Sequence, residues 1–271
     1  MLGHLALSIL TGLFVGVSSG LLGIGGGTIL VPVFRLLFGM SAMEATGTSL
    51  FSIVPTSVSG AAAHVRHGTC IPRLGLAMGL GGALTSPLGV FLASKSPGWA
   101  IMLMAAAIIS MSAYSMFKKA LALPGGKPSD ASDAAAPVAE GACEPAAVMG
   151  STLAKGAAIG LVAGLASGYV GVGGGFVMMP MMIGFLGIPM ALASGTSLIA
   201  VTILAIPGVI EQGLMGNVDI LAGIFVSLGT VPGAYVGARL IKKIPERVLR
   251  LAFGGFLIVA SVLLVANEFF A

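Results

Sequence analysis

The chain has 271 residues, of which 57% are hydrophobic and only 8% are charged, and its mean hydropathy is +1.09. A soluble domain normally carries about a quarter of its residues as charged side chains, so this composition excludes a soluble protein and predicts an integral membrane protein. The net charge of +4 comes from Lys and Arg residues at the ends of apolar runs, which is a topology signal of membrane helices and not a nucleic-acid-binding patch.

The first half of the chain predicts five apolar helical segments. They cover about residues 4–23, 28–38, 43–63, 73–94 and 99–119. No Lys or Arg precedes the first segment, as one would in a signal peptide, so we expect a retained transmembrane helix. The second segment is short and spans only about half of a hydrocarbon core at 1.5 Å per residue. It either re-enters on the side from which it came or completes a crossing together with the extended glycines before it.

A polar segment over residues 122–151, which contains prolines and acidic residues but no aromatic residue, separates the halves. Such a composition predicts a solvent-exposed cytoplasmic linker between a first transmembrane repeat, residues 1–121, and a second, residues 152–271. The second half predicts the same order of segments as the first. They cover about residues 153–171, 176–186, 190–211, 218–241 and 247–268.

One motif occurs once in each half. GLLGIGGGTILVP extends from Gly20 to Pro32, and GYVGVGGGFVMMP extends from Gly168 to Pro180, 148 positions further on. The same offset aligns residues 12–89 with residues 160–237 without a gap, and most of the identical positions are glycines. Duplication and fusion of one ancestral unit explains this similarity, and internal repeats with broken helices are typical of secondary transporters.

Equivalent connections of the two halves carry opposite charge. Residues 64–73 include four basic side chains, whereas the equivalent connection carries Glu211 and Asp219. The next connection reverses this, because residues 239–250 hold five Lys and Arg residues. Since Lys- and Arg-rich loops stay in the cytoplasm, the halves should have opposite orientations, which requires five crossings each. We therefore expect an all-α polytopic membrane protein of two inverted repeats, with both termini outside; re-entrant short segments would instead give parallel halves.

Three consecutive glycines in each half mark the expected binding site. A glycine run inside a membrane must line a cavity or be buried in protein, because hydrocarbon leaves its backbone groups unsatisfied. A helix that restarts after the run offers unpaired N–H groups and the positive end of its dipole, which suit a small anion. We expect the two glycine-broken helices to meet near the bilayer centre, whereas glycines spaced by four are expected to serve close packing. The candidate residues are Gly25, Gly26 and Gly27, with Gly173, Gly174 and Gly175.

A second repeated unit, GTSL, extends from Gly47 to Leu50 and from Gly195 to Leu198. Hydroxyl groups at membrane depth are suited to hydrogen-bond the oxygen atoms of a substrate. The alternative is that they donate to the carbonyl one turn earlier, as Ser and Thr commonly do in membrane helices. We expect these hydroxyls to line the site. They belong to Thr48, Ser49, Thr196 and Ser197.

The chain lacks the patterns of an enzyme or a metalloprotein. There is no HExxH motif, no pair of intramembrane aspartates, and no Lys-Ser/Thr after the glycines to form a phosphate-binding loop. Cys70 and Cys143 do not have metal-ligand spacing, so we expect no catalytic residue, metal or cofactor. Among ionisable residues, Arg35 either attracts an anion or reaches the membrane interface. Glu44 is expected to be stabilised at a helix start, with transfer of a coupling proton as the alternative, and His64 is expected to be solvated.

The doubled glycine-and-proline motif, followed in each half by GTSL, resembles the TauE/SafE family of sulfite and sulfonate exporters. The resemblance implies a multi-pass transporter of the bacterial cytoplasmic membrane that exports small sulfur-containing anions such as sulfite or sulfoacetate. It also implies that substrate contacts fall on the glycine triplets and on the GTSL hydroxyls. The family is often described with seven or eight helices, whereas this chain predicts ten segments.

These features together predict a secondary carrier whose halves rock around a central anion site. Its expected partners are the lipid bilayer and the small anion, with the membrane potential or a proton gradient as the driving force. A passive anion channel, an uptake carrier for another small anion and a non-transporting scaffold are the alternatives.

Overall fold

The computed structural model describes residues 2–121, 150–241 and 244–270, which form ten α-helices and no strand. Each of the ten segments predicted from the sequence is confirmed as one helix. The helices are α1 (Leu2–Leu22), α2 (Gly27–Phe38), α3 (Ala42–Arg66), α4 (Pro72–Ser94), α5 (Gly98–Leu121), α6 (Gly150–Val170), α7 (Gly175–Phe185), α8 (Met190–Leu214), α9 (Ile220–Leu240) and α10 (Glu246–Phe270). Of the predicted linker over 122–151, only Gly150 and Ser151 lie within the described residues, where they begin α6.

The helices have the length and surface of membrane-spanning elements. Five of those described, α4, α5, α6, α8 and α9, are long and apolar enough to cross a bilayer, and α2 and α7 are shorter apolar helices. On α4, the side chains of Leu76, Leu80, Leu84 and Leu88 follow one another at intervals of one turn and are between 48% and 75% exposed. An outward stripe of leucines is compatible with lipid and not with water. The chain is an integral membrane protein.

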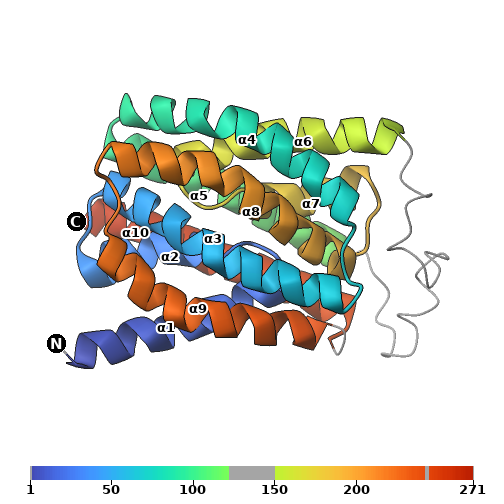
Figure 1. The fold of residues 1–271 in the computed structure, drawn as a ribbon, viewed down its shortest axis with the longest axis horizontal. Coiled ribbons are helices and arrows are strands. Elements are labelled where there is room, and N and C mark those ends of the chain that lie inside the picture. The colour runs from blue at the N-terminus through green and yellow to red at the C-terminus, as the bar shows by residue number, and fades with distance from the viewer. Residues whose placement is uncertain (1, 122–149, 242–243, 271) are drawn as a thin grey trace.

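The two halves are interleaved. The first helix of each half packs along the fourth helix of the other half, so that α1 lies on α9 and α6 lies on α4. Figure 1 shows these two pairs at opposite edges of the bundle, with α3 and α8 in contact between them. The fifth helices, α5 and α10, also pack on each other. Helix α1 begins and α10 ends on one side of the bundle, opposite the side where α6 begins (Figure 1).

Glycines spaced by four make the cross-half pairs possible. A Cβ added at Gly16 of α1 would overlap the backbone of Thr230 on α9, and one added at Gly164 of α6 would overlap the backbone of Gly82 on α4. Gly16 and Gly164 are equivalent in the two repeats, as are Gly82 and Thr230. This arrangement confirms the packing role expected for the spaced glycines, because only glycine lets two helix backbones approach so closely.

Glycines also bend the chain at equivalent positions. Helix α1 ends at Leu22, and Gly23, Gly25 and Gly26 follow with φ angles of 69°, 73° and 88°. Their equivalents after α6 are Gly171, Gly173 and Gly174, with φ angles of 74°, 86° and 69°. Side chains other than glycine rarely adopt this left-handed region. Two helix breaks of the same geometry thus require glycine at the same places, which explains the motif.

Candidate functional site

The two glycine breaks meet inside the bundle. A Cβ added at Gly175 would lie 2.7 Å from the carbonyl oxygen of Gly23 and 3.0 Å from the Cα of Ile24. A Cβ added at the equivalent Gly27 would overlap the backbone of Val172, in the other break. The structure thus brings both triplets together, as the repeated motif predicts. Gly27 and Gly175 lack a side chain that would keep the two breaks apart.

The first glycine of each triplet faces the same pair of apolar side chains. The position of a Cβ at Gly25 is 2.8 Å from Val201 and 3.3 Å from Ile53, and that at Gly173 is 3.0 Å from Ile53 and 3.5 Å from Val201. Ile53 lies on α3, and Val201 is its equivalent on α8. Both side chains are fully buried, so the two breaks meet at the contact between the two central helices.

A helix restarts directly after each break. Gly26 is the N-cap of α2 and Gly174 is the N-cap of α7, both in the left-handed conformation and neither with a side chain that caps the helix. The first helical bonds run from Ile29 N to the Gly26 carbonyl (3.1 Å) and from Val177 N to the Gly174 carbonyl (3.0 Å). The N–H groups before them have no carbonyl in their own helix to accept them. Two helix N-termini with their positive dipole ends therefore lie at the meeting point of the breaks.

The threonines of the two GTSL units join the halves. The Thr48 hydroxyl accepts a hydrogen bond from the backbone N–H of Asp219 (3.0 Å), and the Thr196 hydroxyl accepts one from the equivalent N–H of Ile71 (2.9 Å). Thr196 also donates to the Leu192 carbonyl (2.6 Å). Each threonine thus holds the residue that precedes a helix of the opposite half. Their contact with substrate stays a prediction.

The serines of the same units differ from each other. Ser197 donates either to the Gly23 carbonyl, at 2.6 Å, or to the Ser194 carbonyl, at 2.8 Å. It therefore lies against the first glycine break. The hydroxyl of Ser49 is fully buried and has no hydrogen-bond partner among the described residues.

Sequence reasoning missed three other buried hydroxyls near the helix restarts. Ser19 and Thr28, which flank the first break, and Ser167, which precedes the second, are fully buried without a hydrogen-bond partner in the described part of the chain. Leaving a buried hydroxyl unpaired destabilises a protein by about 1–3 kcal/mol, so such groups call for an explanation. A signal was present in the sequence, because Ser19 and Ser167 occupy equivalent positions directly before Gly20 and Gly168.

His64 is not solvated, contrary to the expectation from its place near a helix end. It is fully buried, with its Nε2 atom 2.9 Å from the Gly20 carbonyl and its Nδ1 atom 2.7 Å from the Thr69 hydroxyl. A carbonyl only accepts, so Nε2 carries the hydrogen and Nδ1 accepts from Thr69. Gln212 occupies the equivalent position and accepts from Asn217 in the same way (2.9 Å). Helix α1 packs against the end of α3 that carries His64, so this side chain is shielded from solvent.

The other ionisable candidate lies where the sequence placed it. Glu44 forms a capping box with Ser41 at the start of α3, in which the Ser41 N–H donates to the Glu44 carboxylate (2.9 Å). Arg35 lies half-buried in the last turn of α2. Neither residue belongs to the glycine triplets.

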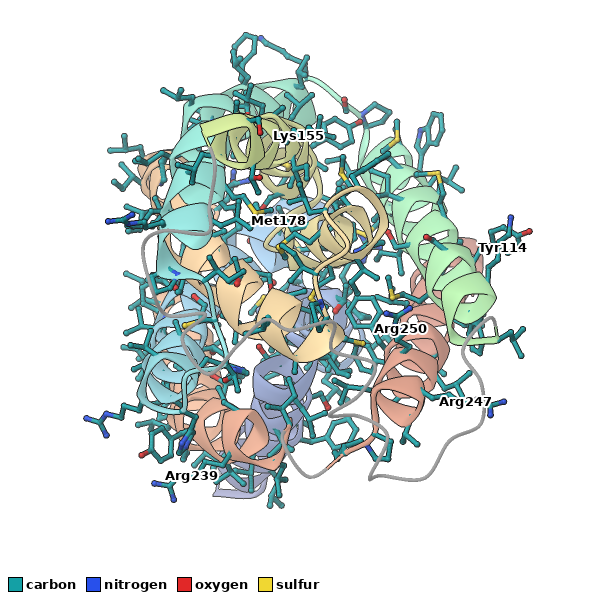
Figure 2. The ribbon with its side chains drawn as sticks, turned by 90° about the vertical axis from the view of Figure 1, so that its right-hand side faces the viewer. Tyr114, Lys155, Met178, Arg239, Arg247 and Arg250 are labelled. Atoms are coloured by element: carbon teal, nitrogen blue, oxygen red, sulfur yellow. The ribbon has the colours of Figure 1, made fainter. Side chains whose placement is uncertain are left out.

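Basic side chains gather at one end of the bundle. Figure 2 looks onto that end and shows Lys155 near the start of α6, Arg239 at the end of α9, and Arg247 and Arg250 in the first turns of α10. Arg66, at the end of α3, reaches the same region by donating to the hydroxyl of Tyr235 on α9. Both arginine-bearing connections therefore lie on one side of the molecule.

A hollow of about 550 Å³ lies between α5, α6 and α7. Its lining is largely apolar and includes Val177 and Pro180 of α7, one turn beyond the helix start. The six triplet glycines are themselves buried and do not line this hollow. Met178, which Figure 2 labels, is buried in the packing of α7.

Comparison with known proteins gives one consistent result. The profile of the family described as "Sulfite exporter TauE/SafE" matches residues 8–264. The probable membrane transporter proteins YdhB and YunE of Bacillus subtilis (strain 168) are 30% and 27% identical; the alignments cover 91% and 86% of this chain and 94% and 85% of theirs. A probable membrane transporter protein of Xylella fastidiosa (strain 9a5c) is 25% identical over 96% of this chain and 95% of its own. No solved structure gives a significant match.

Proposed function

The chain belongs to the sulfite exporter TauE/SafE family, and on this basis we propose that it is a secondary transporter that exports small sulfur-containing anions, such as sulfite or sulfoacetate, by alternating access. The relatives are probable membrane transporter proteins of bacteria, which supports a place in the bacterial cytoplasmic membrane. The observation that carries the proposal is the meeting of two helix N-termini at two glycine breaks inside the bundle.

The substrate site of the proposal is the junction of the two breaks. Backbone N–H groups and dipoles of α2 and α7 favour a small anion there without a buried positive side chain. Ser49 and Ser197 add hydroxyls, and Thr48 keeps its own hydrogen because it only accepts from Asp219. Thr196 already accepts one bond and donates its hydrogen to Leu192, so it has no hydrogen left for a substrate.

The alternating-access part of the proposal requires halves of opposite orientation. Two observations support such inverted repeats. First, the Gly20 carbonyl at the end of α1 lies beside His64 at the end of α3, whereas Gly171 at the end of α6 contacts Thr46 near the start of α3. Second, the two arginine-bearing connections share one side, where positive charge favours the cytoplasm. Five crossings in each half, with α2 and α7 completed by the glycine stretches, give this arrangement.

A flux measurement tests the proposal. The purified protein is reconstituted into liposomes and offered sulfite, sulfoacetate, thiosulfate and acetate in turn. A carrier of sulfur oxyanions gives saturable flux of sulfite or sulfoacetate and counterflow, that is, uptake of labelled anion driven by unlabelled anion inside. Ionic current without exchange would instead support a passive channel. Saturable flux of acetate alone would support a carrier for another class of anion.

A further inference from the structure

We propose that Ser19 and Ser167 are anion ligands, and that each forms a subsite with the N-terminus of the helix that follows it, α2 or α7. This inference rests on the proposed function and names residues that would hold the oxyanion. The starting observation is that both hydroxyls are fully buried and have no hydrogen-bond partner within the described ranges.

Both serines face the glycine at which a helix restarts. The Cβ of Ser19 lies 3.6 Å from the position that a Cβ would take at Gly26, and the Cβ of Ser167 lies 3.4 Å from that at Gly174. Gly26 and Gly174 are the N-caps of α2 and α7 and lack a side chain of their own to cap the helix. Each unpaired hydroxyl therefore stands near the positive end of a helix dipole. At α2 the N–H groups of Gly27 and Thr28 have no partner among the described residues, whereas at α7 Gly175 donates to the Gly173 carbonyl (2.9 Å) and leaves only the N–H of Phe176.

The ordinary role of a membrane serine does not account for these two. Ser and Thr inside apolar helices usually donate to the carbonyl one turn earlier. Ser52, Thr56 and Thr202 of this chain all make that bond, at 3.1, 2.6 and 2.8 Å. The hydroxyls of Ser19 and Ser167 do not make this bond. The backbone carbonyls of the two serines accept ordinary helical bonds from Gly23 and Gly171, at 2.7 Å. The hydroxyl hydrogens are left available for an acceptor that the described residues do not supply.

Space beside the two N-caps distinguishes them from the packing glycines. A Cβ at Gly26 would come no closer than 3.1 Å to Val15, and one at Gly174 no closer than 3.0 Å to the Ala163 carbonyl. At Gly20 and Gly168 the same addition would overlap the backbone of the facing helix. The surroundings of both N-caps are thus tight but less closed than those of the packing glycines: the nearest atoms at Gly26 belong to side chains, and the nearest backbone atom at Gly174 is the Ala163 carbonyl oxygen.

The donor set defines the ligand class. A hydroxyl hydrogen and the backbone N–H left at a helix N-terminus suit a ligand with at least two acceptor oxygens and negative charge, which a sulfite ion or a sulfonate group provides. The two subsites are not identical. Thr28, the second residue of α2, adds another fully buried and unpartnered hydroxyl, whereas α7 has Phe176 at that position. The subsite at α2 should therefore bind the oxyanion more tightly than the subsite at α7.

Binding of sulfite to the purified, detergent-solubilised protein tests the inference by calorimetry. A hydrogen bond to a charged ligand contributes enough that Ser19→Ala and Ser167→Ala should each weaken sulfite binding roughly tenfold or more. Thr28→Val should weaken it as well. Ser86→Ala is the matched control, because Ser86 on α4 is also fully buried and unpartnered in the described chain, but its hydroxyl faces Gly208 of α8 and not an N-cap glycine. Ser86→Ala should leave binding within about twofold.

A second pair of variants guards against loss of folding. Ser19→Cys and Ser167→Cys preserve the buried volume and a weak donor, so they should bind sulfite with intermediate affinity. Equal sulfite affinity in the wild type, both Ser→Ala variants and the Ser86→Ala control would overturn the inference, even if liposome flux supported sulfite export. Serine-dependent sulfite binding in a protein that shows no flux would support the subsites and overturn the proposed transport. A wild type that binds neither sulfite nor sulfoacetate would overturn both.

Discussion

Arg66, at the end of α3, and Arg239, at the end of α9, donate to the same acceptor, the hydroxyl of Tyr235, at 3.5 and 2.7 Å. Arg239 also lies over the Tyr235 ring, 4.3 Å from its centre. The two arginines come from connections that are not equivalent in the two repeats. Their shared partner places the basic ends of both halves on one side of the molecule.

The first prediction concerns membrane orientation. In a background without native cysteines, Arg66→Cys and Arg239→Cys should react with a membrane-impermeant maleimide only in inside-out vesicles, because Lys- and Arg-rich ends remain in the cytoplasm. Lys95→Cys, in the exposed connection between α4 and α5, is the control and should react only in right-side-out vesicles. Labelling of Arg66→Cys and Arg239→Cys from opposite faces would contradict the arrangement around Tyr235.

The second prediction concerns the cross-half helix pairs. Gly164→Ala places a methyl group against the backbone of Gly82 and should destabilise the protein by about 1–3 kcal/mol, because α6 and α4 have to move apart. Gly213→Ala is the matched control, since no atom lies within 4 Å of its Cβ position. It should be neutral or stabilising by about 0.5–1 kcal/mol. Thermal unfolding in detergent measures both, and equal melting temperatures would refute the packing role.

The third prediction separates two functions of the GTSL threonines. Thr48→Val and Thr196→Val should both lower the melting temperature, because each leaves a backbone N–H of the opposite half unpaired. Only Thr48→Val should also weaken sulfite binding, since Thr48 has a hydrogen to donate whereas Thr196 donates its hydrogen to Leu192. Equal loss of sulfite affinity in the two variants would show that this distinction is wrong.

The fourth prediction concerns the buried histidine. His64→Ala should destabilise the protein by about 1–3 kcal/mol, because the Gly20 carbonyl and the Thr69 hydroxyl lose their partner. His64→Gln should have a smaller effect, since Gln212 occupies the equivalent position and bonds to Asn217 there. Melting temperatures in detergent compare the two. If His64→Gln were as unstable as His64→Ala, the inference that glutamine can replace His64, drawn from Gln212 in the second repeat, would be wrong.

Much of the fold follows from periodic apolar sequence and from glycine. The helix breaks are predictable because Gly25 to Gly27 and Gly173 to Gly175 recur at one offset, and the first two glycines of each triplet have left-handed backbone. The two short segments were ambiguous from their length alone, since each is too short to cross as a helix. Whether each short segment crosses the membrane or re-enters depends on the helices against which it packs. Those helices come from the whole chain, so the local sequence does not decide it.

The hydrogen-bond partners of the hydroxyl groups could not be predicted from the sequence. Thr48 and Thr196 were singled out for substrate, yet the structure bonds them to the backbone of the opposite half. Ser19 and Ser167 were overlooked because a serine beside glycine resembles ordinary helix packing. Whether a hydroxyl donates to its own helix, to another helix or to nothing depends on tertiary contacts, and no local pattern encodes it.

The proposed transporter carries its anion at the junction of the two glycine breaks. Counterflow of radiolabelled sulfite in proteoliposomes tests it most directly, with the wild type compared with Gly26→Val and Gly174→Val, which place a branched side chain where φ is 88° and 69°. The account predicts saturable counterflow in the wild type and its loss in both variants, while both remain folded in the membrane. Unchanged counterflow in both variants would contradict it.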